Sequence, residues 1–162
     1  MDKKIERFQE NLALIRSSAG LSAAEFGKKV GVTKQTINSL ERKNSGYKLQ
    51  ETLYYAMRYV LDEEIKNSPN GSLIKGVIDI TVDHADGTDG YTEAEKKELL
   101  SKANVLASSM LSTEDEKTKE VASSMWIDIV TGLVTAAASV GVSVALAALS
   151  KSYSSKTNMK KK

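Results

Sequence analysis

One short segment near the N-terminus constrains the fold more than any other part of the chain. Ser22 stands three residues before Glu25, which is the spacing of a capping box at the start of a helix. Gly31 follows this helix and can adopt the left-handed backbone conformation that ends many helices. Thr33 can then cap a second helix. The pattern therefore predicts two short helices joined by a tight turn.

The same segment contains the residues that a close crossing of two helices requires. Gly27 has no side chain, so it lets the two backbones approach one another. Val32, Ile37 and Leu40 are apolar and can seal the second helix against the first. These features are typical of a helix-turn-helix.

The motif SAAEFGKKVGVTKQTINSLE resembles the helix-turn-helix of the Cro/CI repressor family, also called the XRE family. The resemblance covers about residues 8–65. It implies a prokaryotic-type domain of four to five helices, in which the second helix of the pair enters the major groove of double-stranded DNA. It also implies a structural ion pair between Arg16 and Glu41, joining the first helix to the end of the recognition helix.

The resemblance places the DNA-reading positions on the second helix of the pair. Gln35 can pair with adenine through two hydrogen bonds, and Lys34 can reach guanine or phosphate. The methyl groups of threonine side chains can touch thymine methyl groups. The positions carried over from the family are Thr33, Lys34, Gln35, Thr36, Asn38 and Ser39.

The chain departs from the family pattern at two places that concern the DNA backbone. Ala23 stands where a phosphate-contacting glutamine is common, and the loop after the second helix replaces a Gly-rich one that ends in proline. We therefore expect backbone contacts from the residues of this loop, which are Arg42, Lys43, Asn44 and Lys48.

The expected fold class is mainly α. An N-terminal helix-turn-helix domain of repressor type (residues 1–66) precedes a small α or α+β connector (67–124). A long apolar helix (125–150) and a Lys-rich tail (151–162) follow. The first boundary lies at the turn-rich sequence around Pro69, the only proline of the chain.

Further elements are expected from hydrophobic periodicity and capping signals. Apolar residues at helical spacing predict helices over residues 3–16 and 49–65. Residues 73–82 are rich in Ile and Val and alternate loosely, which favours a short strand or hairpin. Two more capping boxes, Thr92 with Glu95 and Thr113 with Glu116, predict a helix to about residue 111 and another after it.

The run of 21 residues from 129 to 149 contains no charged side chain, and one helix of that length spans about 30 Å. Trp126 and Asp128 would then lie where the membrane interface begins. Rows of small and hydroxyl side chains suggest self-association. We expect this run to hold a cytoplasmic DNA-binding domain at the membrane. The alternative is a re-entrant segment or a soluble oligomerising helix. The lysines beyond the run favour this alternative, because a spanning helix would place them on the side of the membrane away from the cytoplasm.

Sites for catalysis, metals or cofactors are not expected. The chain has no cysteine and one histidine, His84. The Asp- and Gly-rich loop 83–91 fails the register of a calcium loop, because Lys96 takes the position of the bidentate glutamate. The sequence contains no nucleophile elbow and no phosphate loop, so no residues support a catalytic function.

The function that follows is sequence-specific binding of double-stranded DNA by a transcriptional regulator, a repressor that acts as a homodimer. The alternative is a membrane-associated module whose helical domain binds a protein partner. A helix that binds a protein partner more often exposes an apolar anchor residue than a helix that binds DNA. The outward positions of the second helix are uncharged and polar, apart from Lys34.

We expect Val140→Arg, which places a charge near the middle of the uncharged run, to disfavour membrane insertion by about 2.5–3.5 kcal/mol. The protein should then move from the membrane fraction to the soluble fraction of lysed cells. Gly141→Leu is the matched control, because it keeps the run apolar and should weaken only self-association. A wild-type chain found wholly in the soluble fraction would show that the run is an oligomerisation or core segment.

Overall fold

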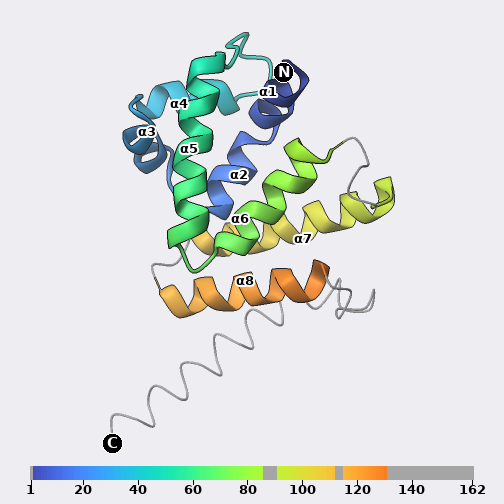
Figure 1. Ribbon diagram of the computed structural model, residues 1–162. Coiled ribbons are helices and arrows are strands. Elements are labelled where there is room, and N and C mark those ends of the chain that lie inside the picture. The colour runs from blue at the N-terminus through green and yellow to red at the C-terminus, as the bar shows by residue number, and fades with distance from the viewer. Residues whose placement is uncertain (1, 86–90, 112–114, 131–162) are drawn as a thin grey trace, which may run out of the picture.

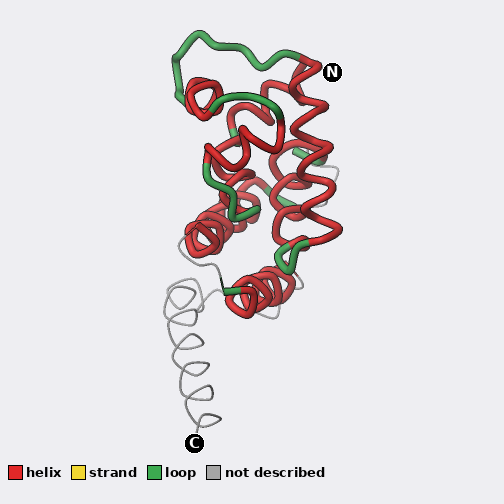
Figure 2. The backbone as a smooth tube through the Cα atoms, turned by 90° about the vertical axis from the view of Figure 1, so that its left-hand side faces the viewer, coloured by secondary structure: helices red, strands yellow, loops and turns green. Residues whose placement is uncertain are grey.

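The computed structural model describes residues 2–85, 91–111 and 115–130 of the chain. Within these ranges the protein is mainly α-helical and contains no strand, as Figures 1 and 2 show. The expected mainly α class is therefore confirmed. A long loop joins α4 to α5 at the top of Figure 2.

The structure divides the helix expected over residues 3–16 at Asn11. The carbonyl oxygen of Arg7 accepts both the side-chain amide (2.8 Å) and the backbone N–H (3.1 Å) of Asn11. The N-terminal part therefore has five helices, which are α1 (Asp2–Glu10), α2 (Leu12–Ser18), α3 (Ala23–Val30), α4 (Lys34–Glu41) and α5 (Glu51–Asn67).

Both helices of the central pair are capped as the sequence predicts. The Ser22 hydroxyl accepts from the backbone N–H of Glu25 (3.1 Å), and the Glu25 carboxylate accepts from the N–H of Ser22 (2.8 Å). This backbone hydrogen bond from Ser22 lowers the pKa of Glu25. Gly31 ends α3 with φ +92°, and the Thr33 hydroxyl caps α4 by accepting from the N–H of Thr36 (3.1 Å).

The strand or hairpin expected over residues 73–82 is wrong. This part forms α6 (Gly71–Ile78) and a π-helical segment, η1 (Asp79–Asp83). Leu73, Ile74 and Val77 are buried at helical spacing, because α6 packs against α2 and α5 on one side and α8 on the other. Burial on several sides explains the Ile and Val content without a sheet.

Two long helices complete the described part of the chain, α7 (Glu93–Leu111) and α8 (Glu116–Val130). The predicted capping box at the start of α7 is confirmed, since Thr92 and Glu95 each accept from the other's backbone N–H (3.2 and 2.8 Å). Thr113 lies outside the described residues. At the start of α8 the Asp115 carboxylate accepts from the N–H of Lys117 (3.1 Å).

Helices from both parts of the chain share one hydrophobic core. Figure 1 shows α7 and α8 side by side beneath the N-terminal helices, and α7 packs on α2 while α8 packs on α6. Buried residues from Phe8 in α1 to Ile129 in α8 form a single cluster. The Asn70 side chain adds a buried hydrogen bond to the carbonyl oxygen of Ser18 (2.6 Å). Residues on either side of position 66, the expected domain boundary, therefore contribute to the same core.

The start of the expected C-terminal helix (125–150) belongs to α8 rather than to a membrane interface. Trp126 is 3% exposed and lies against Gly76 in the core, which corrects its expected place at the edge of a bilayer. Residues 131–162 lie outside the described residues, and most of the uncharged run and the Lys-rich tail are among them. Among the helices that the structure describes, none has the length and apolar character needed to cross a membrane.

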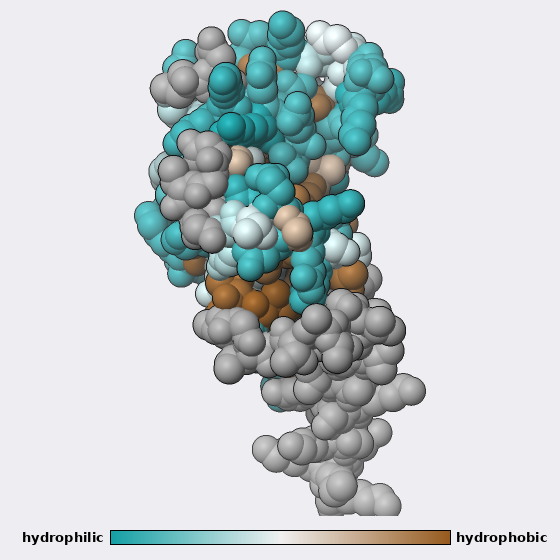
Figure 3. All heavy atoms as spheres, turned by 90° about the vertical axis from the view of Figure 1, so that its right-hand side faces the viewer, coloured by the Kyte–Doolittle hydropathy of each residue, from teal (hydrophilic) through white to brown (hydrophobic). Residues whose placement is uncertain are grey.

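Apolar side chains are unevenly distributed over the surface that the structure describes. Figure 3 shows mostly hydrophilic side chains over the upper part of one face and apolar ones gathered near its lower end. On α8, the exposed large apolar side chains are Ile127 and Val130. They belong to the last turn of α8, directly before the uncharged residues that follow.

We expect Gly76→Ala to destabilise the protein, because a Cβ at this position would overlap the indole ring of Trp126. Alanine favours helix by up to about 1 kcal/mol, but overpacking a core typically costs about 1–3 kcal/mol. The net result should be a lower midpoint of urea unfolding. Ser72→Ala, an exposed change on the same helix, is the control. An unchanged or higher midpoint for Gly76→Ala would contradict this packing.

Candidate nucleic-acid interface

The turn between α3 and α4 packs directly against Gly27. The Gly27 carbonyl oxygen accepts hydrogen bonds from the backbone N–H groups of Gly31 and Val32, both at 2.8 Å. A Cβ at position 27 would lie 2.8 Å from the Val32 carbonyl oxygen and 3.2 Å from that of Thr33. Only glycine fits this approach without a shift of the backbone. The tight crossing predicted for the two helices is therefore present.

A bidentate ion pair fixes the far end of α4. Arg16 Nε lies 2.6 Å from Glu41 Oε1, and Arg16 Nη2 lies 3.0 Å from Glu41 Oε2. The remaining Nη1 donates to the carbonyl oxygen of Leu21 (2.8 Å). The two side chains are only 12% and 13% exposed. This confirms the expected pair, and it directs the only acidic residue of α4 toward α2.

The outward face of α4 is polar, because its apolar residues Ile37 and Leu40 are buried. Thr36 and Ser39 are half-buried, and the Thr33 hydroxyl is occupied in capping the helix. Of the positions expected to read DNA, the exposed ones are Thr33, Lys34, Gln35 and Asn38.

The loop from residue 42 to 50 continues this surface. Its expected backbone-contacting residues are all exposed, and they are Arg42, Lys43, Asn44 and Lys48. Asn44 and Gly46 adopt left-handed conformations, with φ +63° and +72°. The Ser45 hydroxyl donates to the carbonyl oxygen of Ser39 (2.7 Å), so the loop folds back against α4.

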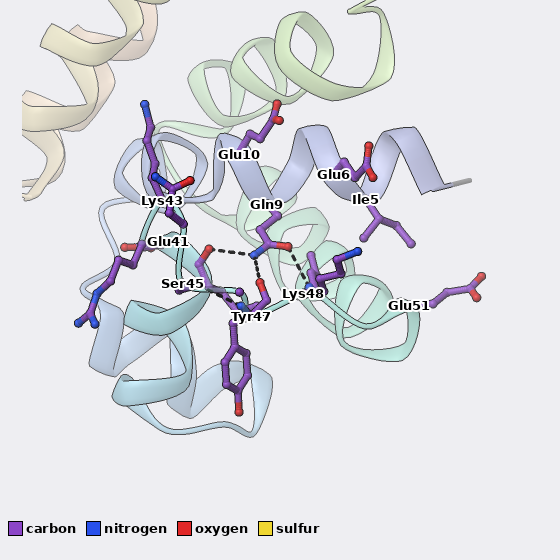
Figure 4. A pocket seen from close by; sticks show the side chains of 15 residues that line it. Ile5, Glu6, Gln9, Glu10, Glu41, Lys43, Ser45, Tyr47, Lys48 and Glu51 are labelled. Atoms are coloured by element: carbon purple, nitrogen blue, oxygen red, sulfur yellow. Dashed lines mark hydrogen bonds between the residues drawn. The ribbon is translucent and has the colours of Figure 1, made fainter.

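Gln9 holds this loop from α1, as Figure 4 shows. Its amide Nε2 donates to the carbonyl oxygens of Leu40 (3.2 Å) and Tyr47 (2.6 Å). Its Oε1 accepts from the backbone N–H of Leu49 (2.9 Å). Sequence reasoning missed Gln9, because its partners lie 31 to 40 residues away and a glutamine on a helix has no local signature.

A groove of about 1010 Å³ lies between α1 and this loop. Its lining carries charges of both signs, since it includes Glu6 and Glu10 of α1 as well as Lys43 and Lys48 of the loop. The groove therefore has no uniform charge that would select an anion or a cation.

Other charged groups stabilise the fold away from α4. Arg58 on α5 binds both carboxylate oxygens of Asp83 in η1 (2.9 and 3.0 Å). Burial raises the pKa of Asp83, but the hydrogen bonds and charge of Arg58 more than offset it and hold this pKa below its ordinary value. No cluster of three or more possible metal ligands occurs in the part of the chain that the structure describes.

Comparison with known proteins identifies no relative of this chain. No family model matches the chain, and neither curated proteins nor solved structures give a match. The resemblance to the Cro/CI family is therefore one of motif, and a function has to be inferred from this chain's own residues.

We expect Arg16→Met to lower the free energy of unfolding by about 3–5 kcal/mol, because it leaves the largely buried Glu41 carboxylate without its partner. The measurement is urea unfolding followed by circular dichroism. Lys66→Met is the control. It removes an exposed ion pair with Glu63, which should contribute at most about 1 kcal/mol. Equal midpoints for the two variants would rule out a structural role for the Arg16 pair.

Proposed function

We propose that the chain is a DNA-binding transcriptional regulator whose α4 enters the major groove of double-stranded DNA. One observation carries the proposal. α4 exposes a polar face without acidic side chains, because its single carboxylate, Glu41, is bound by Arg16. An α-helix of ordinary width fits the major groove, where base edges present hydrogen-bond donors and acceptors.

The exposed side chains of α4 suit the reading of bases. Gln35 and Asn38 each carry an amide that can bond to the two adjacent groups of adenine. Lys34 can donate to guanine or to phosphate. The Arg16 pair and the tight turn at Gly27 hold these side chains on a rigid element, which favours selective binding over nonspecific attraction.

The cations of the loop after α4 suit the DNA backbone. Arg42, Lys43 and Lys48 are exposed on one loop, and neutralising phosphates releases condensed counterions. This contribution does not depend on base sequence and weakens with salt. The loop would thus position the protein on the duplex while α4 reads the sequence.

The alternative function, docking of a protein partner on α4, has less support. Interfaces between proteins usually centre on buried aromatic or aliphatic anchors. The apolar residues of α4, Ile37 and Leu40, are already buried in this protein's own core. We therefore favour DNA, with repression by a homodimer on paired half-sites about one helical turn apart. In this proposal the DNA-binding part lies in the cytoplasm, held at the membrane by the uncharged residues 131–149 that follow α8.

The test of this function is selection of bound duplexes from a random-sequence library by the full-length protein. Enrichment of a common sequence, followed by tighter binding to it than to random duplexes, is the expected result. No binding to any duplex, even at low salt where phosphate contacts are strongest, would refute DNA binding.

We expect Gln35→Ala to weaken binding to the selected duplex by about 1–3 kcal/mol while sparing random duplexes, since it removes a base contact and not a phosphate contact. Lys43→Ala is the matched variant. It should weaken binding to selected and random duplexes alike. The slope of log affinity against log salt concentration should fall by about one, because one phosphate contact is lost. Gel-shift titrations over a range of salt concentrations measure both effects. Equal losses for Gln35→Ala on selected and random duplexes would disprove its role in base reading.

A further inference from the structure

We propose that Tyr47 contacts the sugar–phosphate backbone of DNA and that Gln9 is the residue that positions it. This inference rests on the proposed function and adds two residues to the same interface. Neither residue belongs to the sequence motif, and only the folded structure brings them together.

The backbone at Tyr47 is held from two sides. Its carbonyl oxygen accepts from Gln9 Nε2 (2.6 Å), and its N–H donates to the Ser45 hydroxyl (3.2 Å). The Ser45 hydroxyl in turn donates to the carbonyl oxygen of Ser39 on α4 (2.7 Å). Through Ser45 and Gln9 the loop is tied both to the recognition helix and to α1. Such prior ordering lowers the entropy that binding must remove.

The side chain of Tyr47, in contrast, contributes little to the core. It is 58% exposed, and Figure 4 shows its ring pointing away from Gln9 and α1. An ordered backbone that carries an exposed aromatic side chain is the arrangement expected of a contact residue, since the backbone is held in place while the ring stays accessible.

The loop that carries Tyr47 also carries cations that suit a nucleic-acid backbone. Lys48 follows it directly, and Arg42 and Lys43 lie at the start of the same loop. These cations attract phosphates, the apolar ring can pack on a deoxyribose, and the hydroxyl can donate to a phosphate oxygen. A contact of this kind adds affinity without selecting a base sequence.

The other strongly exposed tyrosines are in acidic surroundings, which makes them useful comparisons. Tyr55 on α5 donates its hydroxyl to Glu51 Oε1 (3.3 Å). Tyr59 is 67% exposed and has Asp62 three residues further along the same helix. Carboxylates repel phosphate, so Tyr59 should make no DNA contact even though it is more exposed than Tyr47.

The experiment compares full-length wild type, Tyr47→Ala, Tyr47→Phe and Tyr59→Ala. Binding is measured by fluorescence anisotropy on a labelled random-sequence duplex of about three helical turns. Tyr47→Ala should weaken binding about threefold to tenfold, and Tyr47→Phe, which keeps the ring but loses the hydroxyl, about threefold. Tyr59→Ala should bind like wild type. Equal affinities for Tyr47→Ala and Tyr59→Ala would overturn the contact.

The role of Gln9 is tested with Gln9→Met, which fills the same space without hydrogen bonds. We expect faster hydrogen exchange at the Leu49 amide and a loss of DNA affinity like that of Tyr47→Ala. Unchanged exchange at Leu49 would overturn the positioning role, whether or not the protein binds DNA. Failure of wild type to bind any duplex would instead refute the proposed function itself, so the two failures are distinguishable.

Discussion

A guanidinium group between α2 and α4 sets the direction of the surface that we propose for DNA. Arg16 binds both carboxylate oxygens of Glu41 and the carbonyl oxygen of Leu21, so one side chain joins α2, the segment before α3, and the end of α4. Moving α4 would leave two largely buried charges without partners, which is far costlier than losing a surface pair. This contact therefore fixes the end of α4 from which the loop begins.

Features that depend on neighbouring residues could be predicted from the sequence. The capping box at Ser22, the left-handed Gly31, the cap at Thr33 and the capping box at Thr92 all involve partners within a few positions. The polar outward face of α4, which we propose reads bases, follows from the same local periodicity, because Ile37 and Leu40 are buried and leave the polar positions outside. The Arg16 pair is a longer-range contact, and it was predicted only through the resemblance to a known family.

Other features that depend on distant residues could not be predicted from the sequence pattern. The Ile- and Val-rich segment around Val77 favours a strand by composition, but contacts with helices on several sides make it helical. Gly76 within it accommodates Trp126, which lies 50 positions further along the chain. Gln9 likewise acts through backbone groups that only the folded chain brings near. Long-range packing and polar side chains that brace loops leave no periodic signal in a sequence.

The contact between Gly76 and Trp126 also provides an optical probe. Trp126 is the only tryptophan of the chain, and it is buried between α6 and α8. Release of α8 would transfer the indole from apolar surroundings to water and change its fluorescence. Because this ring belongs to a different contact from the loop after α4, its emission follows the attachment of α8 separately from events at that loop. The docking of the helix that leads into the uncharged run can thus be followed without an added label.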